Sequence, residues 1–70
     1  MTKEDITQME IDFYNKQSSE YAVIAIANLA QGFAWLATPL KAKAIECFEY
    51  AGRCGAVSVF FKEKAKLLTQ

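Results

Sequence analysis

The sequence predicts an all-α protein, a compact bundle of three or four short helices around a central apolar helix. Apolar residues make up 53% of the 70 residues, enough to form a hydrophobic core. They recur at spacings of three and four, as on one face of a helix, and no stretch alternates like a half-buried strand. A chain of this length forms at most one domain, so residues 1–70 are expected to fold as a single helical unit.

The first helix is expected over roughly residues 3 to 15. Thr2 followed by Asp5 is typical of an N-terminal capping pair, in which each side chain bonds the other residue's backbone. Ile6, Met9 and Phe13 then follow at helical spacing. The polar run from Asn15 to Ser19 predicts a break before the next helix.

The central helix is expected from Tyr21 to Ala37, after a cap at Ser18 or Ser19. This run is apolar on all sides, which is typical either of a helix buried in a bundle or of a membrane segment. It is short for a span and contains alanines together with Asn28, Gln31 and Gly32. We therefore favour the buried helix, and membrane insertion of residues 21–37 stays as an alternative.

Thr38-Pro39 predicts the clearest boundary, because proline disfavours helix in the residue before it and suits the first helical position. A third helix is expected from there. Gly52 and Gly55 either end that helix, giving a fourth over roughly residues 56 to 68, or lie within one long helix. We favour the turn.

Composition argues against an enzyme. Histidine is absent, which removes the commonest general base and metal ligand, and no serine lies in a nucleophile motif. Cys47 and Cys54 form no CxxC pair and are expected to be small core residues. We predict no catalytic residue, no cofactor and no metal site. Two cysteines and a polar, charged stretch over residues 1–20 predict a reducing, cytoplasmic setting.

The formal net charge is zero, so nothing draws the chain as a whole to nucleic acid or to an anionic membrane. Acidic residues concentrate in the first half and basic residues in the second, which favours packing between the two halves. Lys62, Lys64 and Lys66 form a basic stretch near the end of the chain. Weak nucleic-acid binding through this last helix is a further alternative.

The aromatic residues are numerous for so short a chain, at 13%. A small core holds only part of them, and tryptophan and tyrosine often anchor protein interfaces. The residues predicted to contact a partner combine exposed aromatic and basic side chains: Trp35, Tyr50, Phe60, Phe61, Arg53, Lys62 and Lys66.

Residues Asn28 to Ala51 resemble a tetratricopeptide hairpin. Gly32, Trp35, Ala44, Phe48 and Ala51 have the spacing of that motif's Gly, Tyr, Ala, Phe and Ala. The sequence departs from the motif in three respects: Asn28 replaces its Trp, Gln31 replaces its Leu, and the final Pro is missing. No second copy is present, so the resemblance implies a pair of antiparallel helices and no binding residues.

The function predicted from these observations is a non-enzymatic protein–protein interaction module acting through an apolar and aromatic helical surface. Such a module is a small adaptor, an inhibitor or a regulatory subunit, and a homodimer is expected because a small body leaves apolar surface exposed. Minimal size without catalytic groups would suit an accessory protein of a phage or plasmid.

Overall fold

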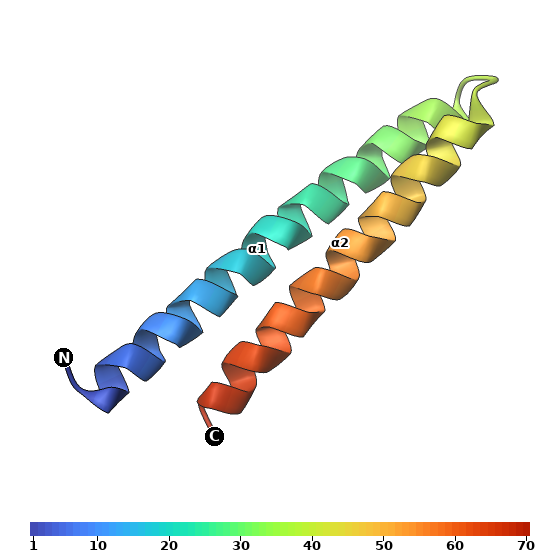
Figure 1. The fold of residues 1–70 in the computed structure, drawn as a ribbon. Coiled ribbons are helices and arrows are strands. Elements are labelled where there is room, and N and C mark those ends of the chain that lie inside the picture. The colour runs from blue at the N-terminus through green and yellow to red at the C-terminus, as the bar shows by residue number, and fades with distance from the viewer.

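The computed structural model describes residues 1–70 as two long helices, α1 (Lys3–Leu36) and α2 (Lys41–Leu68). The helices run antiparallel side by side, so both termini lie at one end and the turn lies at the other (Figure 1). The molecule is an extended hairpin measuring 57 × 15 × 11 Å. The all-α class is confirmed, but the expected compact bundle of three or four helices is wrong.

Local sequence signals fix both ends of α1. Thr2 caps the helix, accepting a hydrogen bond from Asp5 N–H (3.2 Å), while the Asp5 carboxylate accepts one from Thr2 N–H (3.0 Å). The predicted boundary at Thr38-Pro39 is present, but α2 begins at Lys41 after the N-cap Leu40, so Pro39 lies in the turn and not at the first helical position. The Thr38 hydroxyl donates to the Trp35 carbonyl (2.6 Å) and accepts from Leu40 N–H (3.1 Å), which closes the turn.

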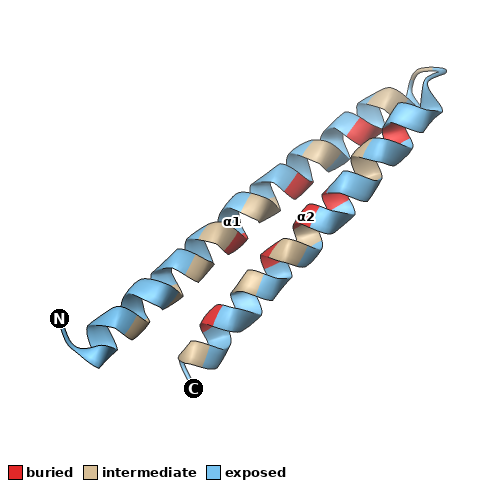
Figure 2. Cartoon of the chain, viewed as in Figure 1, coloured by how far each residue is buried: buried red, intermediate tan, exposed pale blue.

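Small residues at intervals of seven form the contact between the helices. A step of seven residues is close to two helical turns, so each set keeps to one side of its helix. All of them are buried: Ser18, Ala25 and Gly32 on α1, and Ala44, Ala51, Ser58 and Ala65 on α2. Figure 2 shows the buried segments along the facing sides of the two helices. We call this contact the seam.

A buried serine pair sets the register of the seam. The Ser58 hydroxyl donates to the Ser18 carbonyl (2.7 Å), and the two hydroxyl oxygens lie 3.2 Å apart. In antiparallel helices, moving seven residues forward along α1 reaches the same level of the hairpin as moving seven residues backward along α2. The register therefore places Ala25 at the level of Ala51 and Gly32 at the level of Ala44.

The break expected at Asn15 to Ser19 is wrong, because α1 continues through it. Serine is small enough for a close seam, and Ser18 satisfies its hydroxyl across the interface with Ser58. The polar run thus provides one seam residue, Ser18, and its other side chains lie away from the seam. A long two-helix hairpin leaves more of each helix in solvent than a compact bundle does, so polar residues fit inside its helices.

The turn favoured at Gly52 to Gly55 is also wrong. α2 runs unbroken from Lys41 to Leu68, and no glycine has a positive φ. Glycine lowers helix stability without ending a helix unless the left-handed conformation is used. The long helix that the sequence left as the second possibility is the observed one.

The expectation that residues 21–37 are buried all round is wrong as well. Only Ala25 and Gly32 of this segment are buried, while Val23, Ile26 and Phe33 are exposed. Two helices cover each other along one stripe only, so an apolar helix in a hairpin keeps most of its circumference in solvent. No large side chain anywhere in the molecule is fully buried.

Candidate protein-binding face

A groove on one side of the hairpin identifies which residues of the two helices share a surface. Its walls come from Ser19 and Ala22 of α1 and from Val59 and Lys62 of α2, and its floor is the Ser18–Ser58 pair. Residues seven positions away from these wall residues lie on the same side of each helix. The groove therefore extends into a continuous face toward the turn.

The extension consists almost wholly of apolar residues. On α1 the steps of seven lead to Ile26, Phe33, Leu29 and Leu36, and on α2 to Gly52, Ile45, Gly55 and Phe48. Contact between the Phe33 and Phe48 rings, with centroids 5.2 Å apart, confirms that both helices contribute to one surface. We define the apolar face as Ala22, Ile26, Leu29, Phe33 and Leu36 with Ile45, Phe48, Gly52, Gly55 and Val59.

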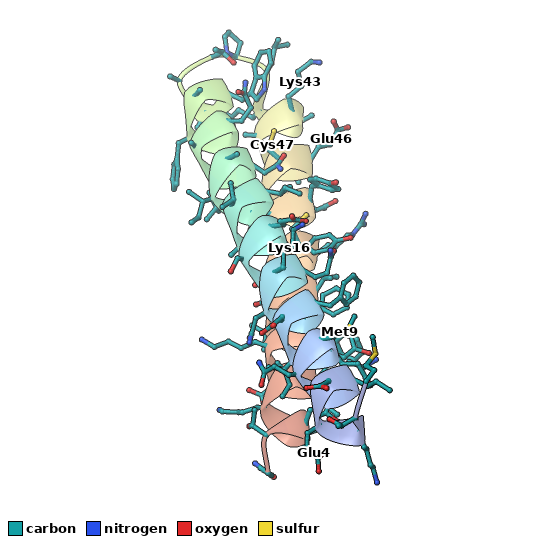
Figure 3. The ribbon with its side chains drawn as sticks, turned by 90° about the vertical axis from the view of Figure 1, so that its left-hand side faces the viewer. Glu4, Met9, Lys16, Lys43, Glu46 and Cys47 are labelled. Carbon is teal, nitrogen blue, oxygen red and sulfur yellow. The ribbon has the colours of Figure 1, made fainter.

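The apolar face is exposed and uncharged. Ile26 has an exposed fraction of 66%, Phe33 of 64% and Val59 of 59%. No charged residue occurs between Tyr21 and Leu40. Charged side chains near the turn, such as Lys43 and Glu46, come from α2 (Figure 3). Lys41, one step of seven before Phe48, borders the face at its turn end. Contiguous apolar surface of this kind is typical of a protein interaction site.

Two glycines in the middle of α2, Gly52 and Gly55, leave part of the apolar face without side chains. A Cβ atom at Gly52 or Gly55 would meet nothing within 4 Å, so packing inside the hairpin does not require glycine at either position. Each costs about 1 kcal/mol of helix stability relative to alanine. Gly32 differs, because a Cβ there would lie 2.6 Å from Phe48 Cε1. The seam explains Gly32 and leaves the other two glycines unexplained.

Toward the open end, the same side of the hairpin becomes polar. Asn15, Lys62, Lys66 and Thr69 line a second groove there. Asp12 lies one step of seven before Ser19 on α1, so it belongs to the same side and is exposed. The Asp12 carboxylate accepts a hydrogen bond from the Gln8 amide (2.9 Å). An apolar half and a polar, charged half thus share one side of the hairpin.

The opposite side of the open half carries an aromatic cluster. The Phe61 ring stacks on Tyr14 and Tyr21, each with centroids 5.9 Å apart, and meets Phe60 edge-on. Lys64 Nζ lies 5.2 Å from the Tyr14 ring centroid and 5.0 Å from that of Phe60. These contacts place aromatic and cationic groups together in an attractive arrangement.

The structure distributes the predicted contact residues over three places. Phe61 and Trp35 lie partly buried beside the seam, and Lys43 Nζ lies over the Trp35 ring at 5.3 Å. Lys62 and Lys66 line the polar grooves on the side of the apolar face. Phe60 is exposed and lies with Lys64 toward the side opposite the apolar face. Arg53 and Tyr50 precede Phe60 on α2 at helical spacing and lie toward the same side. No single surface unites all seven residues.

The titratable groups do not converge. No group of three His, Cys, Asp or Glu residues is placed to hold a metal ion, and both cysteines are free. The hydrogen bond that the Asp5 carboxylate accepts from Thr2 N–H is the main cause that lowers the pKa of Asp5 from its usual 3.8, and the Thr2 side chain contributes less. This shift reflects helix capping. Neither helix has an 18-residue window that is apolar enough to cross a membrane.

The apolar face was not among the residues predicted from sequence. The sequence pattern predicts a buried core for its α1 residues and a turn at Gly52 and Gly55. Two signals in the sequence point to it: the spacing of four and three from Ala22 to Leu36, and glycines inside an otherwise continuous helical pattern. The seam has its own signal, the small residues at intervals of seven.

The chain matches no family model, no curated protein and no solved structure. The antiparallel pair implied by the tetratricopeptide resemblance is present, and Gly32 packs against Phe48. The helices nevertheless have 34 and 28 residues and extend beyond Asn28 to Ala51 on both sides. The resemblance therefore describes how the two helices pack near the turn.

Proposed function

We propose that this chain is a non-enzymatic protein–protein interaction module that binds through the apolar face, in the manner of a small adaptor, inhibitor or regulatory subunit. The observation that carries the proposal is the exposed surface of apolar side chains that both helices build beside the turn. The two free cysteines are in keeping with a reducing, cytoplasmic setting.

The distribution of apolar residues supports binding to protein. Burial of a single exposed Ile, Leu or Phe side chain contributes about 1.5–3 kcal/mol, and the face offers several of them side by side. The face itself is apolar, and the charged residues Lys62 and Lys66 lie beyond it toward the open end; interfaces likewise combine an apolar centre with polar residues at the periphery. The seam leaves these residues unused, since it consists of small side chains.

Site-specific crosslinking tests the proposal. A benzophenone amino acid placed at position 33 is expected to form adducts with protein, either a second copy or another polypeptide, when the full chain is irradiated in its native cells. Position 23 is the matched control, because Val23 is 65% exposed on the same helix but lies off the face. Adducts that form equally from both positions would contradict the proposal.

A further inference from the structure

We infer that the occupant of the apolar face is a second copy of this chain, with two hairpins packed face to face and both turns at the same end. In this arrangement α1 of one copy lies on α2 of the other, so every neighbouring pair in the resulting four-helix assembly is antiparallel. The inference rests on the proposed function and names its partner.

The exposed area of the hairpin matches what a dimer would cover. The chain exposes 5208 Å². A compact monomer of 7.8 kDa exposes about 4,400 Å². The difference of about 800 Å² equals the area that each partner contributes to a stable interface of standard size.

The division of the surface into two halves selects the orientation. With both turns at one end, the apolar half of each copy meets the apolar half of the other. With the turns at opposite ends and the helices fully overlapped, Ile26 of one copy would lie on the polar half of the second, at the level of Asp12 and Lys66. Burial of charged and polar groups against apolar side chains is unfavourable, so the first orientation is favoured.

The two unexplained glycines fit this orientation. Ile26 lies eight residues beyond Ser18 toward the turn, and Gly52 lies six residues from Ser58 in the same direction. At 1.5 Å per residue these positions are about 12 and 9 Å from the serine level. Ile26 of one copy therefore lies close to the level of Gly52 of the second copy, where the missing Cβ atom leaves room for it.

Charges at the open end fit the same orientation. Asp12 lies six residues before Ser18, and Lys66 lies eight residues after Ser58, so both are about 9–12 Å from the serine level toward the termini. Placing α1 on α2 of the second copy brings Asp12 opposite Lys66 at two equivalent sites. Opposite charges at the rim of an interface favour one orientation over the alternatives.

Sedimentation equilibrium of the full chain over a wide concentration range gives the primary test. We expect a reversible dimer of twice the 7.8 kDa chain mass. Ile26→Glu is expected to raise the dissociation constant about a hundredfold or more, because each dimer loses two buried isoleucines and gains two buried carboxylates. Val23→Glu is the matched control, with an exposed fraction of 65% against 66%, and is expected to change it less than threefold.

A charge exchange provides variants at two exposed residues, of which Lys66 also pairs with Glu63 in its own helix (Nζ–Oε1 3.7 Å). Asp12→Lys alone and Lys66→Asp alone are each expected to raise the dissociation constant severalfold at low salt, and the double variant is expected to restore it.

The orientation is tested by a benzophenone amino acid at position 40. Dimer-mass adducts are expected on residues near the turn of the second copy, around 36–45.

A monomer at every concentration would overturn the inference, as would equal effects of Ile26→Glu and Val23→Glu on the dissociation constant. Adducts from position 40 on the terminal residues of the second copy would overturn the parallel orientation. A purified monomer that still forms adducts from position 33 with another protein in cells would refute the second copy while leaving the proposed function in place.

Discussion

The seam and the apolar face differ in a way that inverts the usual rule of burial. The seam buries Ala, Ser and Gly, whereas the face exposes Ile, Leu and Phe. Two helices meet along one narrow stripe, and small residues allow their axes to approach closely along its whole length. In this hairpin, side-chain size decides which residues lie inside, and the larger apolar residues are left for a partner.

The largest expected effect follows from enlarging a seam residue. Ala51→Leu is expected to lower the free energy of unfolding by about 3 kcal/mol, because Ala51 is 4% exposed and the seam has no room for three more carbon atoms. Thermal unfolding followed by circular dichroism, in the Ile26→Glu background to remove association, gives the comparison. Ala30→Leu, on the exposed side of α1, is the control and is expected to change stability by less than about 0.5 kcal/mol. Equal losses would show that size does not govern the seam.

The glycines provide a comparison with opposite signs. Gly32→Ala is expected to cost about 1–2 kcal/mol, since its Cβ would lie 2.6 Å from Phe48 Cε1 and the ring must move. Gly52→Ala in the Ile26→Glu background is expected to gain about 0.5–1 kcal/mol from helix propensity alone. Denaturant midpoints of both variants measure the difference. A loss at Gly52 in the monomer would contradict the open space described for it.

A smaller effect is expected from the serine pair. Ser58→Ala removes the 2.7 Å hydrogen bond to the Ser18 carbonyl and is expected to cost about 1 kcal/mol. Ser19→Ala, next to the pair but exposed, is expected to be neutral. The same unfolding experiment measures both. A neutral Ser58→Ala would mean that the register is held by the alanine layers without the serines.

The smallest effect concerns the pH dependence at the start of α1. Because the pKa of Asp5 is lowered on folding, its contribution to stability is fully present above pH 3.8 and is lost as the pH falls through the lowered value. Asp5→Asn is expected to make the midpoint temperature of unfolding less dependent on pH below 3.8. Thr2→Val retains the backbone donor, which is the main cause of the shift, and is expected to keep most of the dependence. A flat profile in the unsubstituted chain would refute the capping geometry.

Local signals allowed parts of this fold to be predicted. The all-α class, the Thr2–Asp5 cap and the boundary at Thr38-Pro39 follow from propensities and backbone chemistry that act within a few residues. The number of helices does not follow from such signals. Serine and glycine are residue types that favour helix ends, so Ser18 and Gly52 suggest breaks. Whether the helix continues through them depends on the contacts that these residues make in the hairpin.

The candidate face could be predicted only in part, for a related reason. Large apolar residues such as Ile26 and Phe33 were assigned to the core because a bundle buries its largest side chains. The hairpin reverses that assignment, since seam residues such as Ala51 take the inner positions. Whether an apolar stripe faces its own chain or a partner is a property of the tertiary contact, which a helical pattern does not specify.

Solvent accessibility of Ile26 and Val23 in the unsubstituted chain tests the central claim most directly. In a single hairpin the two side chains are almost equally exposed, at 66% and 65%. Paramagnetic relaxation of their methyl groups by a soluble probe should therefore be similar at high dilution. As concentration rises, we predict that Ile26 becomes protected while Val23 stays accessible. Equal relaxation of both residues at all concentrations would contradict the claim that the apolar face is where this protein binds a second copy.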